Sequence, residues 1–366
     1  MNSEFKTVPA ESLADFCRDL FIRLDVPPDD ARTVAEVLVA ADLRGIDSHG
    51  VARMRRYVRG LKDGIMFPRP RVQIVNETPI SALLDGGAAL GQVAGKKAME
   101  IAVAKALEQG AGFVAVQNSN HFGIAGYYSQ MALNHDLIGI ALTNSTPDVV
   151  PTFGREVMLG TNPISVSVPA GGENPYVLDM STAVITSGKL ESRNRMGKKI
   201  PPGWAVDEKG EPCDDPGRVY ANMRGKRGGG LLPLGGAGEE FGGHKGYGLG
   251  LLVDIFSGVL SASANTTLLY PKNPEGKPLP SRVGHFLGAL RVDLFRPLAG
   301  FKADMDDLIR RLKNSPKAEG RERIYIHGEK EFELEKKYRR EGIPLHLKVY
   351  EDLKALAEEA GIPFTL

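Results

Sequence analysis

Three side chains in the first sixty residues have types and spacing that suit proton transfer beside a fixed positive charge. His49, Arg53 and Tyr57 lie four residues apart, so on one helix they would share a face. That face would carry a proton carrier, a fixed cation and a phenol. The same segment holds three further arginines, which makes an exposed charged face an equally good explanation.

A second histidine, His121, stands in the polar stretch Gln117–Gly123, directly after the apolar run Phe113–Val116. This pattern predicts a strand that ends in a turn before a helix. Such turns hold functional side chains on a rigid base and leave them free of the sheet's hydrogen bonds. A lone turn histidine that bonds only to its neighbours fits the local sequence equally well.

Hydrophobic periodicity predicts the elements that position these residues. Helical spacing covers the first 45 residues and the segment after His49, and it returns at 93–107, 249–260, 305–312, 332–338 and 350–360. Short apolar or alternating runs predict strands at 80–85, 113–116, 137–143, 164–168, 176–180 and 285–292. Residues 188–246 are rich in Gly, Pro and charge, and we expect an ordered binding loop there.

Two glycine-rich stretches are candidates for a phosphate site. Residues 110–115 fit a loose G-x-G-x-x-A pattern, but they follow a predicted helix and begin a strand, whereas a Rossmann fingerprint needs the reverse order. Gly242–Gly248 precedes an apolar helix and contains His244 and Lys245, where a helix N-terminus favours anions. Any nucleotide site is therefore expected to be of non-Rossmann type.

Composition limits the classes of partner. The 366 residues include 46 Lys and Arg against 45 Asp and Glu, with no basic stripe, which speaks against nucleic acid or a membrane surface as partner. No apolar run reaches the length of a membrane span and no signal-peptide pattern is present, so we expect a cytoplasmic protein. Cys17 and Cys213 are isolated, so we expect two structural thiols and no metal site.

Taken together, the motifs resemble the type 2 malate/L-lactate dehydrogenase family. They occur in the family's order over nearly the whole chain, as Asp47–Gly50 with Arg53 and Tyr57, Ser119–Gly123, Thr161–Pro163, Val177–Thr182, Leu232–Gly236 and Gly242–Gly248. The resemblance implies a homodimer that binds NAD or NADP on a large, mainly antiparallel sheet in a mixed α/β (α+β), non-Rossmann fold. We expect a helical domain over residues 1–75, joined by C-terminal helices in 300–366, and a sheet-rich cofactor-binding domain over 76–299.

The resemblance also implies roles for single residues. His121 matches the family's general acid/base and His49 a second proton carrier, while Arg53, Tyr57 and Asn162 match the substrate side. Positions that match cofactor contacts are Ser48, Asp179, Met180, Ser181, Thr182, His244, Lys245, Gly328 and Glu329. Two stretches, 224–230 and 270–282, look longer than is usual in the family and are expected to alter dimer or substrate contacts.

These residues suit reversible hydride transfer to a small 2-oxo acid, with L-malate and oxaloacetate as the first choice of pair. Hydride addition at C2 creates an alkoxide, and a protonated His121 with an ordinary pKa of about 6.5 would supply its proton. Arg53 would clamp the substrate carboxylate through two parallel hydrogen bonds. A dicarboxylate needs a second anchor from elsewhere, because helical period turns Arg55 and Arg56 off the His49 face. L-Lactate, sulfolactate, ureidoglycolate and 2,3-diketogulonate are alternative substrates.

The preference between NAD and NADP has little support from the sequence. Lys189, Arg193 and Arg195 follow the Asp179 segment and offer charge-assisted bonds to a 2′-phosphate. They favour dual use with some NADPH preference, although a solvated charged loop explains them equally well.

Two other classes of protein are the alternatives. A hydrolase would use Ser48 and His49, but adjacent turn residues seldom point at each other and no G-x-S-x-G elbow occurs. A non-catalytic, NAD(P)-binding regulatory protein would keep the cofactor site alone. The presence of both histidines and Arg53 speaks against it.

Overall fold

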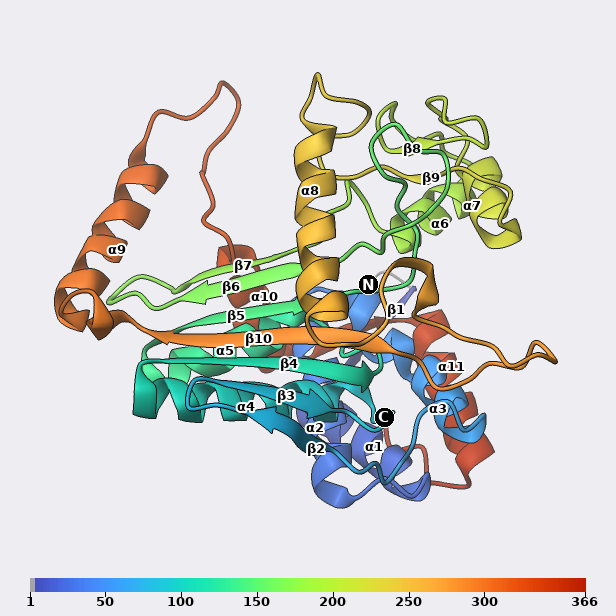
Figure 1. Cartoon of the computed structure of the whole chain (residues 1–366), viewed down its shortest axis with the longest axis horizontal. Helices are drawn as coiled ribbons and strands as arrows, with labels where there is room; N and C mark the ends of the chain where they lie inside the picture. The colour runs from blue at the N-terminus through green and yellow to red at the C-terminus, as the bar shows by residue number, and fades with distance from the viewer. Residues whose placement is uncertain (1–3) are drawn as a thin grey trace.

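The computed structural model describes residues 4–366 and shows a mixed α/β protein built around one large sheet (Figure 1). Within these residues, seven strands form the sheet in the order β2-β3-β4-β10-β5-β6-β7, and all neighbours are antiparallel except β3 and β4. Their bounds are β2 Gln73–Glu77, β3 Ser81–Asp85, β4 Ala111–Ser119, β5 Leu137–Thr143, β6 Ile164–Val168, β7 Tyr176–Met180 and β10 Val283–Arg291. The predicted mainly antiparallel, non-Rossmann fold is confirmed.

Two helices, α4 (Gly91–Gln109) and α5 (Ala125–Met131), cover one face of the sheet. Two strand glycines let them approach closely. A Cβ at Gly112 would lie 2.0 Å from the Ala102 carbonyl oxygen in α4, and one at Gly139 would lie 1.9 Å from the Ser129 carbonyl oxygen in α5. This tight packing gives the strand that leads to His121 a rigid support.

The opposite face of the sheet carries α8 (Gly243–Asp254), which continues as a π-helical turn, Ile255–Val259 (Figure 1). Strand alternation shows the change of face, because Leu287 packs with α4 and α5 while the next residue back, Phe286, meets Phe256 edge-on at 4.9 Å. Short 3₁₀ turns complete this half of the chain, at η3 Ala132–His135, η5 Thr266–Leu268 and η6 Val292–Leu294.

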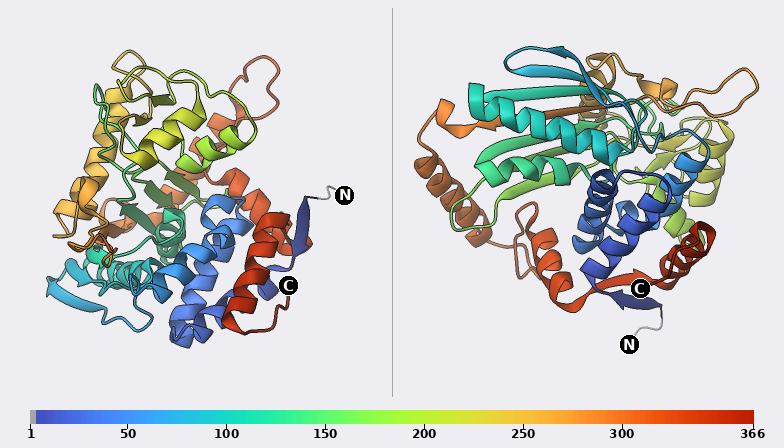
Figure 2. Two further views of the ribbon diagram at one scale, coloured as in Figure 1. Left: turned by 90° about the vertical axis from the view of Figure 1, so that its right-hand side faces the viewer. Right: turned by 90° about the horizontal axis from the view of Figure 1, so that it is seen from below.

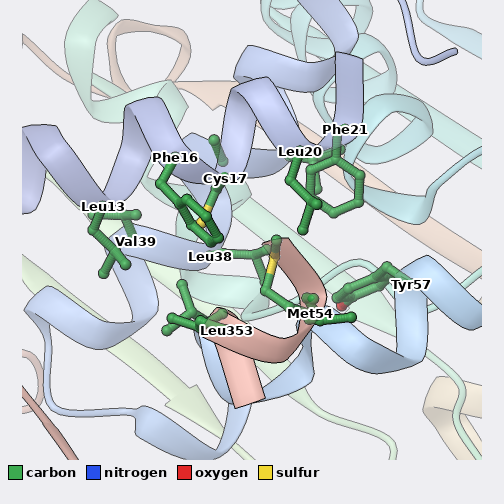
Figure 3. Packing of buried hydrophobic residues seen from close by; sticks show 14 of the residues in the cluster. Leu13, Phe16, Cys17, Leu20, Phe21, Leu38, Val39, Met54, Tyr57 and Leu353 are labelled. Carbon is green, nitrogen blue, oxygen red and sulfur yellow. The ribbon is translucent and has the colours of Figure 1, made fainter. Parts of the chain in front are cut away.

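A helical layer lies beside the sheet (Figure 2). It consists of α1 (Ala10–Arg23), α2 (Pro28–Leu43), α3 (Met54–Lys62) and α11 (Leu347–Ala360), whose apolar faces form one core. Figure 3 shows this core, with Tyr57 among its buried side chains. The strands β1 (Phe5–Val8) and β11 (Ile343–His346) pair antiparallel and bring both ends of the chain to this layer.

Two C-terminal helices differ in position. α10 (Glu329–Glu341) lies against the end of α2, where Glu335 pairs with Arg44 at 3.0 Å. α9 (Leu298–Asn314) stands at the far end of the sheet (Figure 1), and among the described residues it adds no side chain to the helical core. The division into domains at 75/76 and 299/300 stays a prediction. None of the helices in residues 4–366 combines the length and apolar character that crossing a membrane requires.

The stretch 188–246 is not the loop that we expected. It contains α6 (Ser187–Arg195), α7 (Pro216–Gly225) and a short strand pair, β8 (Ala205–Val206) with β9 (Gly230–Leu231). Residues 187–231, the α6–α7 lobe, share a small core that includes Leu190, Val219 and Met223. Helical period is weak here because each of these short helices buries few apolar side chains.

Candidate active site

His121 lies in a rigid turn between β4 and α5. The side chain of Asn120 anchors the turn through hydrogen bonds to two backbone carbonyls and a serine hydroxyl. The ring of Phe122 is stacked between His285 and Tyr128, with centroid separations of 4.5 Å on both sides. Packing and hydrogen bonds therefore hold His121 in place before any ligand arrives.

The second site segment is not the single helix that we expected. Two 3₁₀ turns, η1 (Asp47–His49) and η2 (Val51–Arg53), precede α3. The segment still reaches His121, because Tyr57 Oη lies 2.7 Å from His121 Nδ1 and the His49 ring stacks on the His121 ring at 5.6 Å. Residues far apart in the sequence thus meet in one cleft.

The cleft has a volume of about 310 Å³ and lies between the helical layer, the end of the sheet and the α6–α7 lobe. Besides both histidines and Arg53, its walls include Ser48, Arg56, Thr146, Asp148, Arg224 and Tyr270. The side chain of Arg53 is oriented by its Nε, which donates to the Ser48 carbonyl oxygen at 2.6 Å.

Burial and the neighbouring arginines keep both histidines neutral. Desolvation in the cleft, followed by Arg53 and Arg56, lowers the pKa of His49 to about 4. Desolvation, Arg56, His49 and Arg53 together hold the pKa of His121 well below its usual value. The expected ordinary pKa of His121 is therefore wrong for the ligand-free protein. Burial raises the pKa of Tyr57 to about 12, so its hydroxyl stays protonated.

The hydrogen bonds of His121 define its tautomer. The Gly123 N–H donates to Nδ1 at 3.3 Å, which makes Nδ1 an acceptor. The neutral ring consequently carries its proton on Nε2. The hydroxyl of Tyr57 faces the same Nδ1 and donates to it in this tautomer.

We expected both Arg55 and Arg56 to point away from the cleft, and this holds for Arg55 alone of the two. Arg55 does turn away and pairs with Asp352 at 2.5 Å and Glu359 at 2.8 Å. Arg56, however, lines the cleft, with Nη2 3.4 Å from Tyr270 Oη. The prediction was wrong for Arg56 because it assumed α-helical period from His49, whereas the 3₁₀ turns end at Arg53 and change the register.

The pair Ser48 and His49 also differs from expectation. Ser48 Oγ lies 2.9 Å from His49 Nδ1, so these adjacent residues do point at each other. Among residues 4–366, no carboxylate hydrogen-bonds to the His49 ring. The pair therefore lacks the orienting acid of a hydrolase triad.

Some of the residues expected at the cofactor line a second cavity of about 260 Å³. Asp179 and Gly328 lie in its wall, together with Arg44 and Lys330. Asp179 Oδ2 accepts a hydrogen bond from Gly126 N–H at 2.7 Å, close after the His121 turn. Burial raises the pKa of Asp179 to about 6.

Other expected contacts belong to the scaffold. Ser181 and Thr182 donate through their hydroxyls to the Thr161 carbonyl oxygen, at 3.2 and 3.1 Å, and Met180 pairs with β6 at the end of β7. Asn162 is fully buried, accepting from Ser145 N–H and donating to the Gly250 carbonyl oxygen. The structure does not bring the Asn162 side chain into the cleft.

The basic candidates lie away from both cavities. Lys189 Nζ lies 5.0 Å from the centroid of the Trp204 ring within the α6–α7 lobe. His244 and Lys245 occupy the first turn of α8, and Lys245 lines a separate surface hollow.

Glu329, also expected at the cofactor, forms ion pairs through its carboxylate with Lys313 and Arg323, at 2.9 and 2.7 Å.

The sequence predicted His285 only as part of a strand and did not indicate that its ring supports Phe122, the residue next to His121. Its Nε2 lies 2.7 Å from Ser119 Oγ and its Nδ1 lies 2.7 Å from Thr143 Oγ1, inside the sheet behind Phe122. The sequence feature that could have indicated this is a histidine within an otherwise apolar strand.

Arg224 and Tyr270 begin the two long stretches singled out from the sequence, and both reach the cleft.

Comparisons with known proteins identify the class. Residues 8–354 match the family model described as malate/L-lactate dehydrogenase. The malate dehydrogenase of Pyrococcus abyssi is 46% identical over 99% of this chain and 97% of that protein. The L-sulfolactate dehydrogenase of Methanocaldococcus jannaschii is 41% identical over 94% of each. The crystal structure of malate dehydrogenase from Entamoeba histolytica matches with a TM-score of 0.94 at 37% identity, over 99% of this chain and 100% of that one.

With the fold and the two-histidine cleft, these matches define a 2-hydroxy acid dehydrogenase. The chain belongs to the malate/L-lactate dehydrogenase family. Membership of this family implies a nicotinamide cofactor.

Proposed function

We propose that the protein interconverts L-malate and oxaloacetate with NAD or NADP, in the cleft around His121. The observation that carries the proposal is that His121 lines one small cavity with two arginines, Arg53 and Arg56, while the hydroxyl of the buried Tyr57 contacts the His121 ring from the helical core. Malate dehydrogenases of two Pyrococcus species, 46% and 44% identical to this chain, support the choice of substrate. Sulfolactate is the nearest alternative, supported by the relative that is 41% identical.

The arginines account for a substrate with two anionic ends. Arg53, held through its Nε by Ser48, keeps its terminal nitrogens for the carboxylate beside the reacting carbon. Arg56 lines the same cleft and is the second anchor that a dicarboxylate requires. Both oxaloacetate and a sulfonated 2-oxo acid carry the second charge, whereas pyruvate does not.

The cofactor, when bound, supplies or accepts the hydride at C2. His121 moves the proton. The Tyr57 hydroxyl donates to His121 Nδ1 when that nitrogen is unprotonated and accepts from it when it is protonated. For oxidation the ring must exchange the ligand-free tautomer for the one with Nδ1 protonated, in which Nδ1 gives up the hydrogen bond from Gly123 N–H, donates to Tyr57 Oη and leaves Nε2 free as the base. For reduction, His121 must be protonated. A bound dianion offsets the two arginine charges that lower its pKa, so substrate binding is coupled to proton uptake.

The cavity at Asp179 fits the adenosine end of a nicotinamide cofactor by the chemistry of its walls. Arg44 and Lys330 suit phosphate, the Asp179 carboxyl suits a ribose hydroxyl, and Tyr325 offers an aromatic surface. These residues replace Lys189 as candidates beside a 2′-phosphate. The presence of both a carboxylate and two cations supports use of either NAD or NADP.

A homodimer is also part of the proposal. One side of α8 and its extension is apolar and exposed, with Leu249, Leu252, Ile255 and Val259 between 38% and 60% exposed. In Figure 1 this helix stands free on the open face of the sheet. Exposed apolar area of this kind is typical of an interface, and a second copy of the chain would bury it.

A substrate panel tests the proposal. The purified protein is given oxaloacetate, pyruvate, 3-sulfopyruvate, 2,3-diketogulonate or a cyclic imino acid with NADH or NADPH, and the loss of cofactor absorbance is followed. We expect the highest kcat/KM with oxaloacetate. A strong preference for pyruvate would remove the malate assignment. Cofactor binding without turnover of any substrate would favour the regulatory alternative.

A further inference from the structure

We propose that Asp42 is a positioning residue of this site. Its carboxyl holds the backbone at Gly50 and Val51, which form the joint between the turn that ends at His49 and the turn that ends at Arg53. Asp42 lies near the end of α2 and is 5% exposed. Its Oδ2 accepts a hydrogen bond from Val51 N–H at 2.8 Å. The carboxyl also lies flat against Gly50, where an added Cβ would come within 2.0 Å of Oδ1 and 2.3 Å of Oδ2.

The clamped joint controls two side chains of the cleft at once. His49 ends the turn before the joint and stacks against His121, while Arg53 ends the turn after it. Arg53 also reaches back across the joint to the Ser48 carbonyl oxygen. A shift at the joint therefore displaces both groups relative to His121, and a misplacement of about 1 Å can cost about 100-fold in rate.

A neutral carboxyl group fits this place better than a charged one. Burial raises the pKa of Asp42 to about 8, against the opposing effect of the Val51 N–H and with a further rise from Asp47. Within residues 4–366, Val51 N–H is the hydrogen-bond donor that this carboxyl has. The titratable groups that face it are Asp47 in η1 and the Cys17 thiol in α1, whose own pKa is raised by burial and by Asp42.

Ionisation of Asp42 would place a charge with one donor in an apolar surrounding. Such a charge is stabilised only if water enters, which would separate the carboxyl from Gly50. The joint is therefore expected to be held while Asp42 is protonated and to loosen as the pH rises through about 8. Activity should depend on pH through a residue that touches no substrate.

Two variants separate shape from charge. Asp42→Asn keeps the size and an acceptor oxygen for Val51 N–H but cannot ionise, whereas Asp42→Ala removes the clamp. At pH 7 we expect kcat/KM close to wild type for Asp42→Asn and a loss of up to about 100-fold, with a raised KM, for Asp42→Ala. Above pH 8 the wild-type value should decline while that of Asp42→Asn does not. Asp47→Asn, which removes a nearby exposed charge that raises the pKa of Asp42, should keep the alkaline decline but move it to lower pH.

Hydrogen exchange of the backbone amides in residues 47–53 reports on the joint without turnover. After correction for intrinsic pH dependence, exchange should be fast in Asp42→Ala, should rise above pH 8 in the wild type, and should stay slow in Asp42→Asn. The kcat/KM measurements rest on the proposed reaction, whereas the hydrogen-exchange measurements do not. Failure of the wild type to turn over any 2-oxo acid would refute the reaction, and exchange alone would then decide on the clamp.

Several results would overturn the positioning role. One is wild-type kcat/KM in a folded Asp42→Ala protein. Another is an equal alkaline decline in the wild type and Asp42→Asn, a comparison that holds even if Asp42→Ala fails to fold. A third is slow exchange of residues 47–53 in all proteins at every pH.

Discussion

His121 is a weak base in the ligand-free protein, because burial lowers its pKa most and the nearby Arg56, His49 and Arg53 lower it further. The same arginines make the pKa of His121 sensitive to the binding of an anion. In the proposed complex, the charge of the substrate opposes that of the arginines, so the part of the pKa depression of His121 that the arginines cause is expected to be removed. The direct contact with Tyr57, which donates or accepts, keeps the ring oriented in both states.

This argument predicts the pH dependence of malate oxidation. The neutral ring is the base, and its lowered pKa keeps that form present to lower pH than usual. We therefore expect kcat/KM for oxidation to hold as the pH falls through about 6.5 and to decline only below it. Initial rates over this range test the prediction, and a decline centred at or above this value would contradict it. His121→Asn should lose about 10²–10⁴ in kcat while still binding the cofactor.

At the scale of elements, the interrupted start of α3 decides which arginines line the cleft. Two 3₁₀ turns place Arg53 and Arg56 in the cleft and send Arg55 to the acidic side of α11. The α6–α7 lobe closes the other side and brings Arg224 to the wall. Residues of both the helical layer and the lobe thus line the cleft in which we propose that the substrate binds.

Arg56→Gln is expected to change substrate preference. Loss of a charge-assisted hydrogen bond costs about 1.5–3 kcal/mol, which corresponds to roughly 10- to 150-fold in kcat/KM for oxaloacetate. Pyruvate, which lacks the second carboxylate, should be affected much less. Arg55→Gln is the matched control, since its guanidinium pairs with Asp352 and Glu359 outside the cleft. Equal losses with both substrates would give Arg56 a general role instead.

At the scale of the whole molecule, the sheet is protected unequally. One face is closed by α4 and α5, whereas among residues 4–366 the other carries α8 and its π-helical extension, with exposed leucines. The helical layer and the lobe meet the sheet at the end where the cleft lies (Figures 1 and 2). In our proposal the open face serves association and the cleft serves the chemistry.

Leu252→Glu tests the proposed association. A carboxylate on the outward face of α8 would have to be buried in a dimer, which is costly without a partner. Sedimentation velocity is expected to show a dimer for the wild type and a monomer for this variant. Leu308→Glu, on an exposed position of α9, should leave the dimer intact. A monomeric wild type would contradict the proposal.

The sequence by itself determined the family and most of the long elements, but not the α6–α7 lobe or the edge strands β1, β2 and β11. Each predicted strand is present, since alternation of side chains and flanking turns are local properties. The order of α4, Gly110 and β4 correctly excluded a Rossmann fingerprint, because that order is read directly along the chain. His121, His49, Arg53 and Tyr57 were selected for their chemistry and spacing, and the structure brings them together.

Only the tertiary structure decided what depends on contacts between distant segments. The orientation of Arg56 follows from 3₁₀ turns that Asp42 holds from another helix. The pKa of His121 follows from burial and from arginines remote in sequence. Asn162 has the type of a ligand residue but lies inside the scaffold. Local pattern carries no information on which segments meet, and burial, charge and backbone register are set by that meeting.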